Sequence, residues 1–226
     1  MTIGRMGDLC VTDEYVDSLI DSGNRIIGID PSLGGCGISC IDSDGVFNTW
    51  IETKSSIPAY YRMVAIKDAI YDTYQNKLDG VSFFVMEAAV TGGWSSPLMF
   101  ALSVFLLGMC AELNKPVLFI HVSKLRTFVN HIFSIPKKYE KPIIDIFSEC
   151  GYVFQNKMGT DCVDAMLLAS IYSKYVGLAF PKYADKWDTC MFKKYLEPLS
   201  QNIFLPKCDY KITKKDFNGI VDIKIA

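Results

Sequence analysis

Four carboxylates stand where a short apolar segment ends or where a helix is expected to begin. Asp30 follows one apolar run and precedes a Pro/Gly turn, and Glu87 ends another run before a Gly-rich loop. Asp161 and Asp164 are three residues apart, so on a helix both point to one side. Hard divalent cations prefer carboxylate oxygens, and four carboxylates can hold two ions. The set predicts a phosphodiester-hydrolysing centre with two Mg²⁺ or Mn²⁺ ions per active site.

Each carboxylate on its own also has a simpler interpretation. Asp before Pro is common in turns, which would explain Asp30. Glu87 could form an ion pair with a neighbouring lysine. Acids in the first turn of a helix are stabilised by the helix dipole, which would explain Asp161 and Asp164. It is the four together, in this order and each at the end of an element, that favour a metal site.

The elements expected to carry these residues alternate along the chain. Short apolar runs bounded by turn residues predict strands, residues 42–45 predict a hairpin turn, and apolar side chains at helical spacing predict helices. Among several α/β folds, three antiparallel strands followed by alternating helices and parallel strands is the order of a ribonuclease H-like mixed sheet flanked by helices. The predicted strands cover 25–30, 37–41, 46–53, 81–86 and 117–121, and the predicted helices cover 59–78, 98–113, 141–150 and 160–176.

Three motifs in this order resemble those of RuvC-type Holliday junction resolvases, the crossover junction endodeoxyribonucleases. Residues 27–33, Ile-Gly-Ile-Asp-Pro-Ser-Leu, resemble the opening motif of the family, and residues 85–87, Val-Met-Glu, match its strand-end glutamate. Residues 161–169 match the family's D-x-x-D-A-L-x-x-A helix. The spacing also fits, with roughly 57 residues from the first acid to the glutamate and about 75 more to the aspartate pair. The resemblance covers about residues 25–177 and extends to phage and viral members.

The resemblance implies a ribonuclease H-like fold and a homodimer that resolves four-way DNA junctions by paired, symmetric, metal-dependent nicks. It implies that Asp30, Glu87, Asp161 and Asp164 are the catalytic metal ligands. The family also carries basic residues between the fifth strand and the last catalytic helix, and phosphate contacts of this kind weaken with salt. The corresponding DNA-binding candidates here are Lys124, Arg126, Lys137, Lys138 and Lys141, of which Lys124 and Lys138 are preferred.

The chain departs from the typical bacterial family pattern in two respects. The sequence predicts an N-terminal extension over 1–24 and a C-terminal extension over 178–226, on either side of a nuclease domain at 25–177. The loop after the glutamate has Val90 where the family has a phenylalanine that is thought to enter the junction, although Trp94 farther along could stack on a base. A broader branched-DNA nuclease that cuts flaps and forks is therefore an alternative, as is a non-catalytic branched-DNA-binding scaffold. Actin-like sugar kinases share the first strand ending in Asp, but they are usually longer chains.

Composition narrows the class of protein. With 226 residues, 50% hydrophobic and 21% charged, the chain is a folded domain of ordinary size, not a disordered segment. Residues 1–114 hold 6 Lys and Arg against 14 Asp and Glu, whereas 115–226 hold 17 against 11, which is compatible with a phosphate-bearing partner. The longest apolar run, 97–111, is too short to cross a bilayer, and no secretory signal is evident. We expect a soluble, intracellular, cytoplasmic protein with no membrane partner, in which the apolar helix over 98–113 is a candidate dimer interface.

Overall fold

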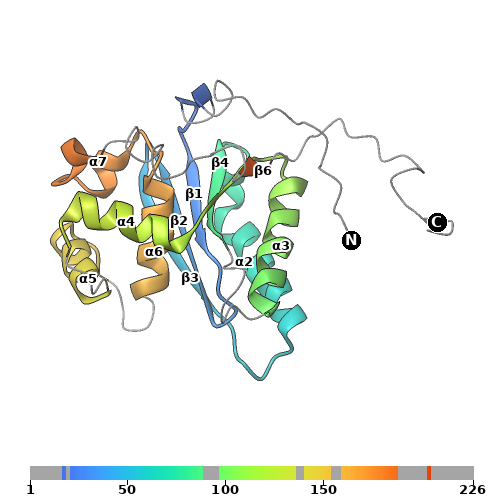
Figure 1. The fold of residues 1–226 in the computed structure, drawn as a ribbon. Helices are drawn as coiled ribbons and strands as arrows, with labels where there is room; N and C mark the ends of the chain where they lie inside the picture. Colours follow the sequence, from blue (N-terminus) through green and yellow to red (C-terminus); the bar gives the residue numbers. More distant parts are fainter. Residues whose placement is uncertain are drawn as a thin grey trace, which may run out of the picture.

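The protein is built on a six-stranded mixed sheet with helices on both faces (Figure 1). The computed structural model describes residues 17–18, 21–88, 97–135, 140–153, 159–187 and 203–204. The strand order is β3-β2-β1-β4-β5-β6. The strands are β1 (Ile26–Asp30), β2 (Gly35–Asp42), β3 (Gly45–Glu52), β4 (Phe83–Glu87), β5 (Val117–Ile120) and β6 (Ile203–Phe204), and the helices are α2 (Ala59–Leu78), α3 (Pro97–Glu112), α4 (Val122–Phe133), α5 (Glu140–Glu149), α6 (Gly159–Ser170), α7 (Val176–Ala179) and the 3₁₀ turn η2 (Ala184–Lys186).

The directions of the strands determine which strand ends lie side by side. β1, β2 and β3 form an antiparallel meander, while β1, β4 and β5 run parallel to one another. In the ladder Ile29 lies opposite Met86, and Glu87 lies opposite Ile120. The carboxyl ends of β1, β4 and β5 therefore share one edge of the sheet, which is where such sheets usually place their ligands.

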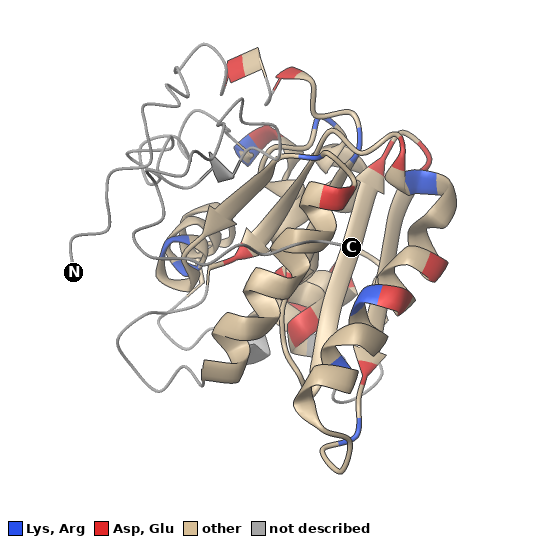
Figure 2. Cartoon of the chain, turned by 90° about the vertical axis from the view of Figure 1, so that its right-hand side faces the viewer, with Lys and Arg blue, Asp and Glu red and all other residues tan. Residues whose placement is uncertain are grey.

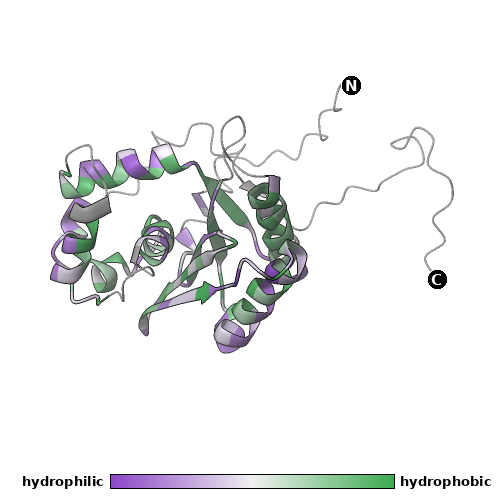
Figure 3. Ribbon diagram, turned by 90° about the horizontal axis from the view of Figure 1, so that it is seen from below, coloured by the Kyte–Doolittle hydropathy of each residue, from purple (hydrophilic) through white to green (hydrophobic). Residues whose placement is uncertain are grey.

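Two separate cores form because side chains alternate between the faces of a strand. On β1, Ile26 packs with α4, α5, α6 and α7, whereas Ile27 and Ile29 pack with α2 and α3. Figure 3 shows the sheet between these two helical layers. Alternation also places Asp30 on the same face as Ile26, toward α6, and the same count places Glu87 on the face of Phe83 and Val85. The strand pattern thus aims both strand-end acids at one helix.

Glycine lets α6 lie directly on the sheet. A Cβ atom added to Gly28 of β1 would lie 2.0 Å from the Ala165 carbonyl oxygen and 2.5 Å from the Ala169 backbone nitrogen. At Gly37 of β2, it would lie 2.1 Å from the Asp161 carbonyl oxygen. Only a residue without a side chain permits this approach, so these two glycines allow α6 to lie close to β2 at its first turn and to β1 along its second half.

The predicted ribonuclease H-like mixed sheet is confirmed, and each predicted strand agrees with an observed one to within two residues at either end. Helix α6 is shorter than the predicted helix over 160–176. The Ser173 N–H donates to the Ser170 carbonyl at 3.2 Å, and the Ser173 hydroxyl accepts from the Tyr175 N–H at 3.1 Å. These bonds turn the chain before it resumes as α7. Of the predicted extensions over 1–24 and 178–226, only residues 17–18, 21–24, 178–187 and 203–204 are among the described residues.

Four of the described elements were not predicted from the sequence, namely α4, the short α7 and η2, and β6. Helix α4 occupies part of the stretch in which the sequence predicts only basic DNA-binding residues. Its buried side chains, Leu125, Phe128, Val129, Ile132 and Phe133, follow helical spacing, a signal that could have identified it. The two-residue strand β6 pairs with β5 from far along the chain, and so short a segment carries no periodic signal. Among the helices described, none is both long and apolar enough to cross a membrane.

Candidate metal centre

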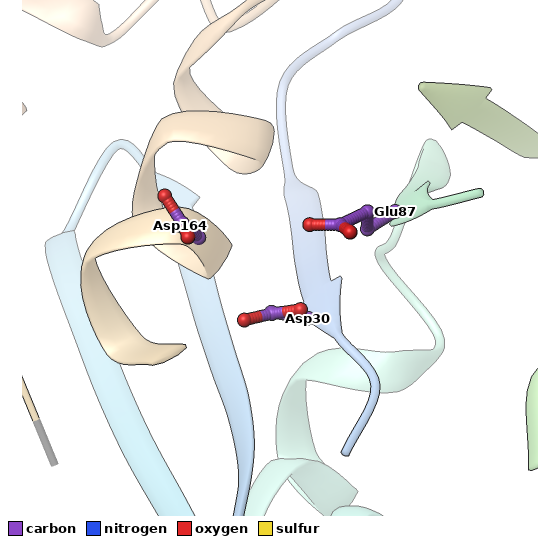
Figure 4. A group of neighbouring side chains, drawn as sticks. All are labelled: Asp30, Glu87 and Asp164. Carbon is purple, nitrogen blue, oxygen red and sulfur yellow. The ribbon is translucent and has the colours of Figure 1, made fainter. Parts of the chain in front are cut away.

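Three carboxylates from three separate elements converge at the shared edge of the sheet. Asp30 ends β1, Glu87 ends β4, and Asp164 lies in the second turn of α6. One carboxylate oxygen from each lies within 4.8 Å of the other two (Figure 4). All three side chains are partly buried. The arrangement could hold a divalent cation, because carboxylate oxygens are the donors that hard cations prefer.

Burial and mutual repulsion make these acids hard to ionise. Burial raises the pKa of Asp30 well above its usual value, and the charges of Glu87 and Asp164 raise it further. Burial and then the Asp164 charge raise the pKa of Glu87 to about 7, against the opposing effect of the Arg126 cation. Perturbed acids in one cluster are typical of functional sites, since a fold gains no stability from placing like charges together.

The raised pKa of Glu87 predicts that the metal-free protein loses stability as the pH rises. Between the ordinary value of 4.5 and the folded-state value of about 7, the folded protein keeps a proton that the unfolded chain has lost. The free energy of unfolding therefore falls across this interval and stays low above it. Glu87→Gln removes this ionisation. We expect it to raise the free energy of unfolding at pH 8 by about 1–3 kcal/mol, measured as a higher melting temperature in chelator.

Glu112→Gln is the matched control for this measurement. Glu112 is an exposed residue bound to Lys67, and that hydrogen bond lowers the pKa of its carboxyl. Its loss should leave stability at pH 8 unchanged or slightly reduced. A Glu87→Gln protein that melts below wild type at pH 8 without metal would contradict the crowded acidic site.

Asp161 stands beside this cluster without being one of its three members. It lies in the first turn of α6, and its Oδ2 accepts a hydrogen bond from the Trp50 indole N–H at 3.2 Å. Burial raises the pKa of Asp161, while the hydrogen bonds from Trp50 and Thr160 partly oppose this. The Asp161 charge nevertheless acts on both Asp30 and Glu87, so the fourth predicted ligand is an electrostatic neighbour of the other three. Its role as a ligand stays a prediction.

Only some of the predicted DNA-binding residues are among the residues that the structure describes. Lys124 and Arg126 are exposed on the first turns of α4, which begins directly after β5 at the edge where the carboxylates meet. Of the two, Arg126 has an effect on the pKa of Glu87 and so lies near the cluster. The remaining candidates, Trp94, Lys137, Lys138 and the side chain of Lys141, lie outside the described residues.

Two contributors to the site were not anticipated from the sequence. Trp50, on the middle of β3, had no signal beyond its place in a predicted strand. His121 precedes α4, and its Nδ1 accepts the Ser123 backbone N–H at 3.2 Å, which caps the helix that carries Arg126. Histidine is not among the usual capping residues, so neither the cap nor the helix start was apparent.

Comparison with known proteins supports the architecture described above. No protein-family model and no curated protein matches the sequence. A solved structure of Thermus thermophilus RuvC in complex with a Holliday junction substrate is similar, with a TM-score of 0.50 and 13% identity over 64% of this chain and 90% of that one. A second Thermus thermophilus RuvC structure gives a TM-score of 0.50 and 12% identity over 69% of this chain and 98% of that one. At this identity the likeness is one of fold, and the chain has the ribonuclease H-like mixed α/β fold seen in RuvC.

Proposed function

We propose that this protein is a metal-dependent, structure-selective endonuclease that resolves Holliday junctions by paired nicks. The observation that carries the proposal is the convergence of Asp30, Glu87 and Asp164 on one edge of a ribonuclease H-like sheet. The fold shared with RuvC, one of whose structures holds a Holliday junction substrate, supports four-way DNA as the substrate. The motif resemblance in the sequence points the same way on independent grounds.

The donor set fits Mg²⁺ or Mn²⁺, because it consists of carboxylate oxygens alone. Asp30, Glu87 and Asp164 would hold the first ion, with Asp161 available to a second. Bound divalent ions would supply an activated water and would stabilise the leaving 3′ oxygen of the cut strand. The carboxylates would orient that chemistry at the end of the sheet, and partial burial would limit access of bulk water.

Basic residues beside the acids would hold the strand that is cut. Lys124 and Arg126 lie on the first two turns of α4, and Arg126 lies near Glu87. The amino end of a helix also favours phosphate, because its backbone N–H groups point outward there. We propose that these two side chains position the backbone phosphate against the carboxylates, and that Lys137, Lys138, Lys141 and Trp94 extend the DNA-binding surface.

We further propose that the active form is a homodimer formed through α3. This helix has no Asp, Glu, Lys or Arg before Glu112, and its ribbon in Figure 2 is tan over the rest of its length. Leu98, Phe100 and Val104 are 46%, 55% and 51% exposed. A connected apolar surface of this kind favours cover by a partner, and a two-fold pair would supply the two active sites that paired nicks require.

Val104→Glu should therefore convert the protein to a monomer with its fold intact. The side chain is exposed in the single chain, so a carboxylate costs little there, but in a two-fold interface it would be buried near its own copy. Mass measurement by light scattering after size exclusion checks this. Leu178→Glu is the control, because Leu178 is 52% exposed on α7 in the opposite helical layer. A Val104→Glu protein with the mass of a dimer would contradict this interface, and a monomeric wild type would contradict the dimer.

The test of function is a cleavage assay on a labelled four-way junction. Matched duplex, flap and fork substrates are run beside it, with Mg²⁺, with Mn²⁺ and with chelator. Paired symmetric nicks confined to the junction, and lost in chelator, are the expected result. Equal cutting of flaps and forks would make the protein a general branched-DNA nuclease with the same metal site. Junction binding without cutting in either metal would instead favour the scaffold function.

A further inference from the structure

Of the four carboxylates predicted from the sequence, three form the cluster and the fourth is bound to a neighbouring residue. Asp30, Glu87 and Asp164 bring oxygen atoms within 4.8 Å of one another, whereas Asp161 is tied to a neighbour on a different strand. That neighbour is Trp50, whose indole N–H donates to Oδ2 at 3.2 Å. A carboxylate that accepts such a hydrogen bond keeps further lone pairs with which it can bind a metal ion.

Trp50 is itself held in place by the strand beside it. Gly35 of β2 lies under the indole, and a Cβ atom there would lie 2.4 Å from Nε1 and 2.6 Å from Cε2. The ring thus lies against a strand that has no side chain at this point. The ring has no space to move toward Gly35, which restricts the positions that its N–H can take.

Two other residues of β3 also contact α6. The Cys162 thiol lies 3.6 Å from the Thr49 carbonyl oxygen, and the Asn48 amide nitrogen lies 3.7 Å from the Met166 sulfur. Asn48 and Trp50 therefore face the same helix from alternate positions of one strand. The contact between Trp50 and Asp161 is part of this packing and is held by the same elements that bring Asp164 to Asp30.

We infer that Trp50 is a positioning residue that holds the Asp161 carboxylate as a ligand for the second of two metal ions and keeps it out of the set that holds the first. The inference rests on the proposed metal-dependent nuclease. Outer partners that orient metal ligands commonly change metal affinity by 10–100-fold when they are removed. Loss of the N–H should therefore weaken the second ion more than the first, because the hydrogen bond from Trp50 goes to Asp161.

The experiment compares wild type with Trp50→Phe and Trp187→Phe. Phenylalanine keeps an aromatic ring at this position and removes the N–H donor together with part of the indole. Trp187 is the control, because it is buried in the aromatic cluster on the other side of α6 and its Nε1 has no hydrogen-bond partner among the described residues. Mn²⁺ binding is measured by calorimetry on each protein alone, and the Mn²⁺ dependence of junction cleavage is measured in parallel.

Trp50→Phe should weaken the second Mn²⁺ by about 10-fold or more, and the first ion less. The half-saturating Mn²⁺ concentration for cleavage should rise by a similar factor, whereas kcat at saturating Mn²⁺ should change little. Trp187→Phe should match wild type in both measurements. Equal weakening of both ions, or an unchanged Mn²⁺ profile, would overturn the role of Trp50.

Asp161→Asn tests the same idea even if Trp50→Phe folds poorly. It leaves the indole in place, sits in an accessible first turn of α6, and should lose the second ion while keeping the first. Retention of both ions in this variant would overturn the inference. A wild type that binds one Mn²⁺ would overturn the inference but leave a one-metal nuclease standing. A wild type that binds none would overturn the proposed function as well.

Discussion

Glu87→Gln and Asp164→Asn should each reduce junction cleavage by about 10³-fold or more while junction binding survives, because metal-held charge contributes several kcal/mol to the transition state. Both substitutions keep the shape of the side chain and remove the charge. Both residues belong to the set of oxygens that lie within 4.8 Å of one another, so either change removes a ligand from the centre of the cluster. Cleavage rates under single-turnover conditions and gel-shift binding in chelator measure the two effects separately.

This prediction has an internal check against misfolding. The same Glu87→Gln change is expected to stabilise the metal-free protein, because it removes a carboxyl whose pKa burial raises to about 7. An inactive variant with a higher melting temperature cannot owe its inactivity to unfolding. Glu112→Gln again serves as the control and should cleave at the wild-type rate, since Glu112 contacts Lys67 and Tyr71 on the opposite helical layer. Undiminished cleavage by both site variants would refute the site.

The expected opposition between stability and activity indicates that the acidic cluster is suited to bind a cation. Burial and crowding raise the pKa of Asp30 and of Glu87 at once, so the metal-free fold bears an electrostatic cost at neutral pH. A divalent cation would remove that cost and would stabilise the folded protein by binding it preferentially. Added Mn²⁺ should accordingly raise the melting temperature of wild type more than that of Glu87→Gln.

The sequence was sufficient to predict five of the six strands because strand signals are local. Apolar runs bounded by turn residues located β1, β4 and β5, and the alternation of side chains explains why Asp30 and Glu87 face the same helix. The i and i+3 spacing of Asp161 and Asp164 located the start of α6, although a shared helix face did not guarantee a shared position. Trp50 comes from a strand more than a hundred residues earlier, and no local pattern could reveal that it binds Asp161.

Helix α4 shows a second reason why part of the site could not be predicted from the sequence. Its apolar spacing is present in the sequence, where charged residues such as Lys124 and Arg126 lie between the apolar positions. The position of Arg126 relative to Glu87 depends on β5 lying beside β4 and on the chain turning at once into a helix capped by His121. Such a relation is set by the order of strands in the sheet, and that order is a property of the whole fold.

Gly28→Ala should destabilise the protein by about 3 kcal/mol or more, which corresponds to a fall in melting temperature of roughly 6–12 °C. The added Cβ would lie 2.0 Å from the Ala165 carbonyl oxygen, and backbone atoms cannot rotate away as a side chain can. Helix α6 must therefore move from β1. Ala165 directly follows Asp164, so the displacement also moves a ligand away from Asp30, and cleavage should fall even at temperatures where the variant remains folded.

Gly34→Ala separates this effect from the general cost of replacing glycine. Gly34 lies in the turn between β1 and β2, and a Cβ there meets only the Ser32 hydroxyl at 3.9 Å, an ordinary contact. We expect that variant to match wild type in melting temperature to within about 2 °C, in line with surface changes of at most 0.5 kcal/mol. If Gly28→Ala were equally harmless, α6 would not rest on β1 as described, and the position of Asp164 would need another explanation. If cleavage by Gly28→Ala falls at temperatures where the variant remains folded, the close approach of helix and strand positions the metal ligand as well as stabilising the fold.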